Sequence, residues 1–374
     1  MELSAGQLSE LRDALLIDIR SGEERAYGVI EGALAASPEE LMEIALRERG
    51  KKLVLICARG VRSLELAESL CEQGFEAYSL RGGYAAWLRE DLRRRESEAL
   101  CRQAEASLRK KFRNSIMGPF HRALREYRLV NPGDRIAVCM SGGKDSMLLA
   151  KLFQELKRHS DVPFEVAYLV MDPGYNPENR AIIEENARLL QIPIQIFESR
   201  IFDSVYHVEK SPCYLCARMR RGYLYSFARE LGCNKIALGH HFDDVIETIL
   251  MGMLHGGQIQ TMMPKLHSTN YAGMELIRPL YFVREEDIKA WRDYNGLHFI
   301  QCACKFTDTC TTCNDGQNHS KRQETKELIR ALKKTNPHVE QLIFHSVENV
   351  NVDTVLAYKK NGVRHSFLDE YDSE

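Results

Sequence analysis

The chain has 374 residues, of which 44% are hydrophobic, and a formal net charge of −2. At about 150 residues per domain, this length predicts two or three domains, and the hydrophobic share is large enough to exclude global disorder. A charge this close to zero excludes a basic signature of the whole chain, so a nucleic-acid partner would have to be bound by local patches.

No apolar run reaches the roughly 18 residues that a spanning helix needs, so no membrane partner is expected. The N-terminal residues lack a basic segment followed by an apolar one, so no signal peptide is predicted. Eleven cysteines then indicate a reducing compartment, with thiols for catalysis or metal binding rather than disulfides. We therefore expect a cytoplasmic protein.

Residues 1–92 are predicted to form a small α/β domain, with strands at 15–19, 53–56 and 77–80 and a helix at 61–73. Cys57 follows the second strand and enters a short loop before the helix, beside Arg59 and Arg62. Helix N–H groups and cations lower the pKa of a thiol and hold a thiolate or persulfide anion. The alternative is a plain buried cysteine at a strand end.

This segment resembles a single rhodanese domain. The resemblance rests on Asp18, Arg20, Gly32–Ala33, the Cys57 loop, and Gly82–Gly83, which open a predicted short helix carrying Trp87. Residues 28–33 depart from the family pattern, in which His and Pro are frequent, and this leaves the sulfur donor open. The resemblance implies that Cys57 carries a sulfane sulfur as a persulfide.

Residues 93–114 mix basic and acidic side chains and are interpreted as a helical linker. The basic cluster at 109–113 indicates either a solvated helix face or a contact with nucleic acid, and the solvated face is the favoured interpretation.

Residues 135–146 read RIAVCMSGGKDS. The apolar run 136–140 is typical of a buried strand, and apolar residues after Lys144 recur at helical spacing. The loop Ser141–Gly143 would then direct free N–H groups and the positive end of a helix dipole at one point, which predicts an anion site. Ser146 adds a hydroxyl. The spacing differs from the Walker pattern, and a simple glycine turn is the alternative.

Residues 115–300 are predicted to form a doubly wound α/β domain. Further strands are expected at 165–171, 194–198 and 235–238, with helices at 179–190, 220–231 and 245–254. Such sheets bind ligands beyond the carboxyl ends of their strands. Asp172 and Gly239–His240–His241 follow strand ends, as the 141–146 loop does. Asp243 and Asp244 come next: one is expected to cap the following helix, and both are candidates to hold Mg²⁺ on nucleotide phosphates.

A CxxC pair, Cys213 and Cys216, lies at the predicted start of a helix. Such a pair indicates a redox site, half of a metal site or a coincidence, and the missing thioredoxin-like strand favours metal. The arginines that follow, Arg218, Arg220 and Arg221, are either ordinary solvated residues or a phosphate-contact patch. Residues 301–374 are interpreted as a cysteine-rich segment and a C-terminal helical extension, whose basic segment 320–334 is solvated or contacts RNA.

The SGGKDS loop, the PCYLC segment, LGHHFDD and a cysteine after Phe299–Ile300–Gln301 resemble the TtcA family of tRNA 2-thiocytidine synthetases. These are PP-loop ATP pyrophosphatases with an adenine nucleotide alpha hydrolase-like fold. The resemblance implies an ATP-dependent tRNA sulfurtransferase that adenylates the C2 oxygen of a cytidine, at tRNA position 32, and replaces it with sulfur. It also implies a 4Fe-4S cluster with one open iron, held by Cys213, Cys216 and Cys302.

The candidate ATP-binding residues are Ser141, Gly142, Gly143, Lys144, Asp145, Ser146, Asp172, Gly239, His240 and Asp244. Asp145 and the persulfide carrier Cys57 are the candidate catalytic residues.

Several alternatives stay open. Register alone leaves Cys304 as a second choice for the third cluster ligand, and Cys304, Cys310 and Cys313 are candidates for a Zn²⁺ site or a thiol relay. Expected partners are tRNA, a persulfide donor such as a cysteine desulfurase and, in a homodimer, a second copy. Rival functions are thiolation of another base such as a uridine, a non-catalytic iron–sulfur RNA-binding regulator, and a zinc protein without a cluster.

Overall fold

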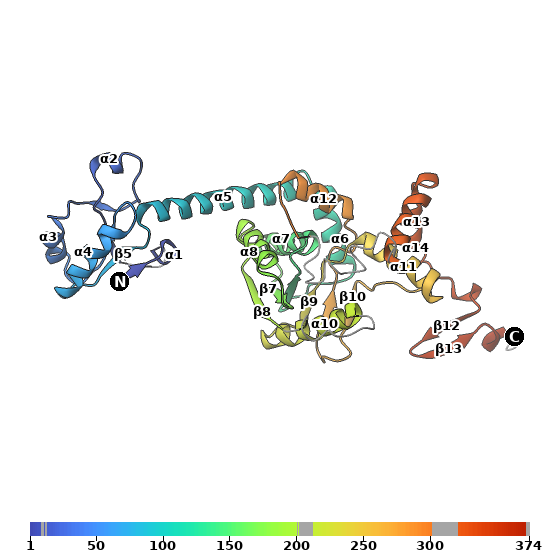
Figure 1. The fold of residues 1–374 in the computed structure, drawn as a ribbon. Coiled ribbons are helices and arrows are strands. Elements are labelled where there is room, and N and C mark those ends of the chain that lie inside the picture. Colours follow the sequence, from blue (N-terminus) through green and yellow to red (C-terminus); the bar gives the residue numbers. More distant parts are fainter. Residues whose placement is uncertain (9–10, 12, 200, 202–211, 301–320, 372–374) are drawn as a thin grey trace. The chain divides into compact units, whose positions relative to one another are not determined.

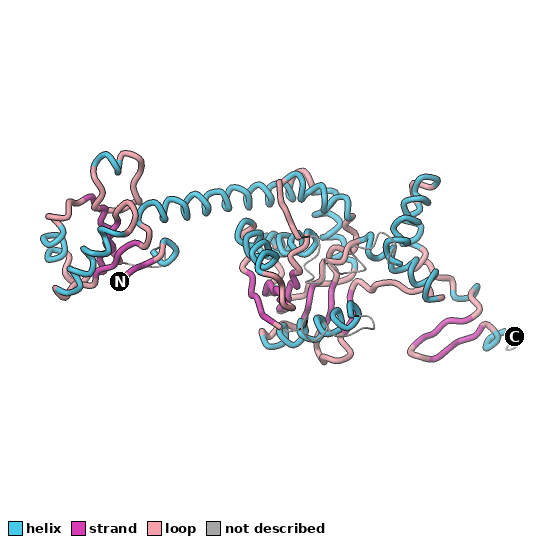
Figure 2. The backbone as a smooth tube through the Cα atoms, in the orientation of Figure 1, coloured by secondary structure: helices cyan, strands magenta, loops and turns pink. Residues whose placement is uncertain are grey.

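The computed structural model describes residues 1–8, 11, 13–199, 201, 212–300 and 321–371 (Figure 1). The chain divides into two compact units, Met1–Ala99 and Leu100–Glu374. Each unit is built around its own large β-sheet, drawn in magenta in Figure 2. Within the described ranges, no helix combines the length and the apolar character needed to cross a bilayer.

The first unit contains a parallel sheet in the order β1-β5-β4-β2-β3. Its strands are β1 (Glu2–Leu3), β2 (Ala14–Asp18), β3 (Leu34–Ala35), β4 (Lys52–Ile56) and β5 (Ala77–Leu80), and its helices are α1 (Ala5–Leu8), α2 (Gly22–Arg25), α3 (Leu41–Arg47) and α4 (Val61–Glu72). Strand β4 is a nearly continuous buried run, as expected for a parallel strand covered on both faces. The three strands predicted from the sequence are confirmed.

A single helix of 27 residues, α5 (Gly83–Arg109), follows β5 after a turn at residues 81–82 (Figure 1). The expectation of a short helix at Trp87, separate from the linker, is therefore wrong, whereas the helix predicted for the linker is confirmed as far as Arg109. The physical reason is that residues 84–109 contain no Gly or Pro that would end the helix. Past residue 100 the helix packs into the core of the second unit, where Ala104 and Leu108 are fully buried.

A buried ion cluster fastens this end of α5 to α7 (Lys144–His159). Nζ of Lys151, a fully buried residue, lies 2.6 Å from Oε1 of Glu105, and a guanidinium nitrogen of Arg158 lies 2.7 Å from Oε2. Burial raises the pKa of Glu105, but hydrogen bonds from Arg158 and Lys151 outweigh this effect and hold the pKa at about 2.

We expect Glu105→Gln to lower the free energy of unfolding by about 3 kcal/mol at pH 7, because Lys151 is then buried without its carboxylate. The contribution of Glu105 is present above the ordinary pKa of 4.5 and is lost as the pH falls toward about 2. Urea unfolding at pH 7 and pH 3 should therefore show a smaller difference from wild type at pH 3. Glu96→Gln, at an exposed position of the same helix, is the control. If Glu105→Gln lowers the free energy of unfolding equally at both pH values, the lowered pKa of Glu105 is not the cause of the loss.

The second unit contains a sheet in the order β10-β11-β9-β6-β7-β8. Its strands are β6 (Arg135–Met140), β7 (Glu165–Asp172), β8 (Ile194–Glu198), β9 (Lys235–Ala237), β10 (Lys265–His267) and β11 (Glu275–Ile277). All neighbours are parallel except β10, which pairs antiparallel with β11. The chain winds from β6 outward to β8 and then resumes on the other side of β6 at β9. A crevice forms at such a switch point, beyond the carboxyl ends of the two central strands.

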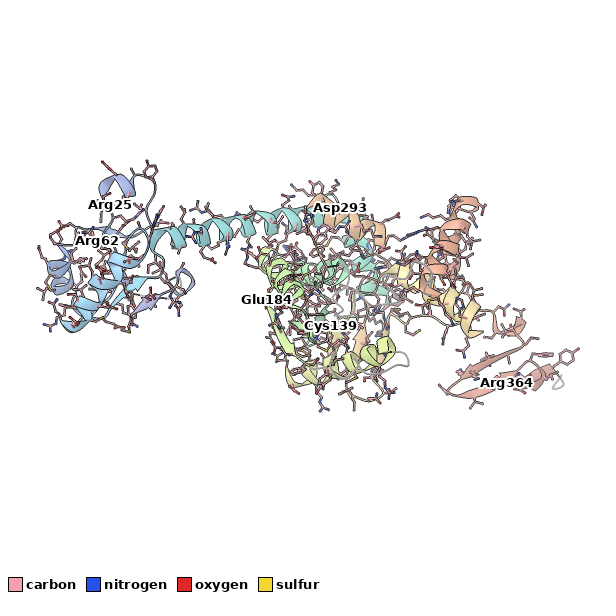
Figure 3. All side chains as sticks on the ribbon, in the orientation of Figure 1. Arg25, Arg62, Cys139, Glu184, Asp293 and Arg364 are labelled. Carbon is pink, nitrogen blue, oxygen red and sulfur yellow. The ribbon has the colours of Figure 1, made fainter. Side chains whose placement is uncertain are left out.

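Helices cover both faces of this sheet. The remaining helices of the unit are η1 (Arg113–Met117), α6 (Gly118–Glu126), α8 (Pro177–Leu189), α10 (Pro212–Glu230), α11 (Phe242–Gly256), α12 (Glu285–Tyr294), α13 (Lys321–Thr335), α14 (Val339–His345), η2 (Val352–Thr354) and α15 (Leu368–Tyr371), with a hairpin of β12 (Ala357–Lys360) and β13 (Val363–Ser366). Ile136, Val138 and Met140 of β6 pack into the core that contains α7, whereas Ala137 and Cys139 (labelled in Figure 3) pack into the core that contains α10. This alternation confirms the doubly wound α/β prediction.

Candidate functional site

The loop between β6 and α7 has the geometry of an anion site. Gly143 is the N-cap residue of α7, so the N–H groups of the first helical turn have no acceptor within the helix. The Ser146 hydroxyl donates to the Gly143 carbonyl oxygen at 3.0 Å, and the Ser141 N–H donates to Ser146 Oγ at 3.2 Å. Gly142 has a φ of +81°, a conformation that favours glycine. The predicted strand, loop and helix are confirmed.

This loop lines a cavity of about 460 Å³, which we call the loop cavity. Two of the three strand-end motifs predicted to converge meet in it: the loop itself, and the stretch from the end of β9 to the start of α11. They contribute Ser141, Asp145, Ser146, Gly239, His240 and Asp244, and α10 adds Arg220 and Arg221. The cavity thus combines helix N–H groups, hydroxyls, carboxylates and cations, which suits a nucleotide polyphosphate and its counter-ion.

Gly239 permits the close approach of β9 to the loop. A Cβ atom at this position would lie 3.1 Å from the carbonyl carbon of Asp145 and 3.2 Å from the Ser146 nitrogen. Because both neighbours are backbone atoms at the start of α7, a side chain here would push the two segments apart. Burial lowers the pKa of the next residue, His240, to about 4, so its ring is neutral at pH 7.

Opposite charges surround the start of α7. Lys144 Nζ lies 3.0 Å from Asp145 Oδ2 and 3.2 Å from Glu285 Oε1. Burial lowers the pKa of Lys144, but these carboxylates outweigh burial and raise it, so the ammonium is charged. The other oxygen of Asp145, Oδ1, is buried and has no hydrogen-bond partner among the described residues. A carboxylate oxygen without a donor is a suitable ligand for a hard cation.

The cap of α11 differs from the expectation. His241 is the N-cap residue, and its N–H donates to Asp244 Oδ2 at 3.0 Å, so neither Asp243 nor Asp244 is the cap. Asp243 accepts the Glu285 N–H at 2.7 Å and thereby joins α11 to α12. Burial raises the pKa of Asp244, but His241 and Arg322 hold it below its ordinary value.

Asp172 is placed apart from the loop cavity. It lines a separate hollow of about 570 Å³ at the end of β7, together with Arg180. Its Oδ1 accepts the N–H groups of Gly174 and Tyr175 at 2.8 and 2.6 Å, and its Oδ2 lies 2.7 Å from Arg180. These contacts hold the turn after β7 in place. A role of Asp172 in binding ATP stays a prediction.

Arg322 is a residue of the site that no sequence pattern singles out. It belongs to α13 and lines the loop cavity. Its guanidinium lies 2.6 Å from Asp244 Oδ1 and 2.7 Å from Glu247 Oε2. In the sequence it is one of six basic residues on an amphipathic helix. Only its contact with Asp244, which lies 78 residues earlier in the chain, distinguishes it from the others.

The predicted cluster ligands lie largely outside the described residues. Helix α10 begins at Pro212, so positions 213 and 216 fall in its first turn, three residues apart. The side chains of Cys213 and Cys216 are not described, and Cys302, Cys304, Cys310 and Cys313 lie in the undescribed range 301–320. Within the described residues no group of three or more His, Cys, Asp and Glu side chains is arranged to hold a metal.

The first unit holds Cys57 in the predicted loop before α4. Its Sγ accepts the N–H groups of Gly60 at 3.1 Å and Ser63 at 3.4 Å, and it lies 3.1 Å from Ser63 Oγ. Burial raises the pKa of Cys57, but these donors outweigh burial and lower it. Among the described contacts, no hydrogen bond joins the side chain of Arg59 or Arg62 to the sulfur. The anion is therefore stabilised by backbone and hydroxyl donors, not by direct contact with the expected arginines.

Comparison with known proteins agrees with both units. Residues 113–307 match a PP-loop domain and residues 4–90 a rhodanese-like domain. A tRNA-cytidine(32) 2-sulfurtransferase from Acaryochloris marina is 35% identical over 246 residues, which are 65% of this chain and 83% of that protein. This chain belongs to the tRNA-cytidine(32) 2-sulfurtransferase family. The predicted family and enzyme class, a sulfurtransferase, are thereby confirmed.

Two further similarities extend the comparison. The relative of the same name from Alkalilimnicola ehrlichii is 37% identical over 234 residues, covering 61% of this chain and 70% of that protein. Among solved structures, the U34-tRNA thiolase NcsA from Methanococcus maripaludis aligns over 62% of this chain and 77% of its own, with 20% identity and a TM-score of 0.48. This structural likeness is too weak to bear on function. The PP-loop match itself implies the use of ATP.

Proposed function

We propose that the protein is an ATP-dependent tRNA sulfurtransferase that converts a cytidine, at tRNA position 32, into 2-thiocytidine. The observation that supports this most strongly is the cavity at the PP-loop, in a chain that is 35% identical to a tRNA-cytidine(32) 2-sulfurtransferase. The cytidine C2 oxygen attacks the α-phosphate of ATP and pyrophosphate leaves. Sulfur then attacks C2, and AMP departs with the oxygen.

The residues of the loop cavity fit the first step. The first-turn N–H groups of α7 and the hydroxyls of Ser141 and Ser146 bind the phosphates, because they are unpaired or free to reorient toward an anion. Lys144 supplies positive charge near the same point. Asp145 Oδ1, which is buried and accepts no hydrogen bond among the described residues, is together with Asp244 our choice of ligand for the Mg²⁺ that accompanies ATP.

The sulfur chemistry rests on thiolates. Cys213 and Cys216 lie near the start of α10, and with Cys302 they are our candidate ligands of a 4Fe-4S cluster. Such a cluster, held by these three thiolates, would supply sulfur as the nucleophile. Cys304 stays the alternative third ligand, and a zinc site at Cys304, Cys310 and Cys313 stays a prediction.

Cys57 is proposed as the carrier that delivers sulfur to this chemistry. Its sulfane sulfur would come from a persulfide donor such as a cysteine desulfurase. The sulfur of a persulfide is two electrons more oxidised than that of a thiocarbonyl, so a thiol must supply those electrons during transfer. Fusion of carrier and acceptor in one chain raises the effective concentration of the sulfur.

Mass spectrometry of tRNA nucleosides tests the proposal. Deletion of the gene is expected to remove 2-thiocytidine, and the wild-type gene, but not Cys213→Ala, is expected to restore it. Loss of a thiouridine in place of 2-thiocytidine would retain the enzyme class and correct the base. If every thionucleoside is unchanged, thiolation of tRNA is wrong, and the regulator hypothesis, which predicts RNA binding without turnover, replaces it.

A further inference from the structure

A second cavity, of about 900 Å³, adjoins the loop cavity and shares Arg221, Leu238 and His240 with it. We call it the arginine cavity, because Arg218, Arg221, Arg229 and Arg278 line it. No carboxylate is among the described residues of its lining. The rings of Tyr225 and Tyr271 stack on one another in its wall, with centroids 5.0 Å apart and planes 10° apart. The cavity therefore offers positive charge and aromatic surface together.

Arg278 is the decisive residue of this cavity. It is 9% exposed, its guanidinium donates to the Met263 carbonyl oxygen, and its Nε has no partner among the described residues. No described carboxylate forms an ion pair with it, although most buried arginines need one. Burial lowers its pKa to about 10, which still leaves it charged at pH 7. Nδ1 of His240, which faces both cavities, is likewise buried without a partner.

A buried cation without a counter-ion destabilises the free protein, and an anionic ligand would remove that cost. A guanidinium with free N–H groups matches a phosphate in shape and charge. This phosphate does not belong to ATP bound at the PP-loop, because Arg278 lines the neighbouring cavity and the loop serines line the first. Aromatic rings beside arginines are typical of sites for single-stranded RNA, whose splayed bases stack on them.

We propose that the arginine cavity binds the RNA strand beside the nucleotide that is thiolated, with a backbone phosphodiester on Arg278 and a neighbouring base against Tyr271. This inference rests on the proposed function and adds the place where the substrate strand lies. The shared residues Arg221 and His240 then stand between the strand and the nucleotide, where the base to be activated has to enter.

The test is Arg278→Met in the full chain, with an unmodified tRNA transcript as the probe. Fluorescence anisotropy is expected to show binding weakened about 10- to 100-fold, the loss of a hydrogen-bonded charged contact. The slope of log K against log salt should fall by about 0.7, as for one contact to a single strand. Affinity for ATP alone should stay within about twofold of wild type. The melting temperature should not fall, because the variant removes an unpaired buried charge.

Arg284→Met is the matched control. Arg284 is also largely buried, but its guanidinium lies 2.8 Å from Glu340 and 3.3 Å from Asp243. The same substitution is expected to lower the melting temperature here and to leave the tRNA affinity of the folded protein unchanged. Should Arg278→Met fail to fold, Arg278→Lys keeps the charge and removes the planar fork, and it should still weaken binding several-fold.

Three outcomes would overturn the inference. If Arg278→Met binds tRNA as the wild type does, the cavity does not hold the strand, while the proposed function stands. If ATP affinity falls and tRNA affinity does not, the phosphate at Arg278 belongs to the nucleotide. If the wild-type protein itself does not bind tRNA, the proposed function fails first and this inference with it.

Discussion

Gly142→Ala is expected to reduce ATP-dependent thiolation at least about 100-fold in kcat/KM. A Cβ atom at this position would lie 2.5 Å from Cγ1 of Ile183 and 2.8 Å from Cδ1 of Ile300; Ile183 is fully buried and cannot easily give way, so we expect the loop to shift. The loop N–H groups then lose their alignment on the phosphates, and displacements of about 1 Å cost rates of this order. Release of AMP and formation of the thionucleoside measure the effect.

Gly133→Ala separates this clash from backbone strain. Gly133 has a φ of +82°, nearly the +81° of Gly142, but an added Cβ meets nothing within 4 Å. In both variants the left-handed conformation of the alanine lowers the free energy of unfolding by about 1 kcal/mol, and only Gly142→Ala displaces the PP-loop. If both variants lose activity equally, strain and not the position of the loop is responsible, and the assignment of the anion site is wrong.

Cys57→Ser is expected to abolish loading of a persulfide and to reduce thiolation from a persulfide donor at least about 100-fold. Two N–H groups and the Ser63 hydroxyl lower the pKa of Cys57, and a serine hydroxyl at the same place neither ionises near neutral pH nor carries sulfane sulfur. Intact-protein mass spectrometry detects the added sulfur. Inorganic sulfide should bypass the carrier and restore thiolation in the variant.

Cys71→Ser is the control for this experiment. Cys71 lies in the same unit on α4, half-buried, and its thiol donates to the Ala77 carbonyl oxygen at 3.2 Å. A serine can keep that bond, so loading and transfer should match wild type. Undiminished transfer from the persulfide donor in Cys57→Ser would show that sulfur reaches the acceptor by another route.

Local patterns predicted the elements that carry the site. Residues 136–140 read as a buried strand and Ser141–Gly143 as a tight loop because both signals lie within a few residues, and β6 and α7 follow them. The same holds for Cys57 between β4 and α4. The change of composition near residue 93 predicts a boundary where α5 has none, because residues 84–109 contain no Gly or Pro that would end the helix.

Contacts between residues far apart in the chain cannot be predicted from such local patterns. Arg322 meets Asp244 across 78 residues, and Glu285 meets Lys144 from the start of another helix. His241 took the cap position expected of Asp243 or Asp244 because the β9 strand ends before it. No sequence pattern singles out Arg278, and its burial without a carboxylate follows only from how the end of β11 packs among its neighbours.

The sequence by itself determined the two modules, the PP-loop, the reactive cysteine loop and the family, since each depends on residues close together in the chain. The tertiary structure decided which strand ends share a cavity, that Asp172 lies apart from it, and that a second, arginine-lined cavity adjoins it. The physical reason is that burial, counter-charge and close backbone approach are properties of neighbours in space, and those neighbours are set only when the sheet has formed and its helices have packed on both faces.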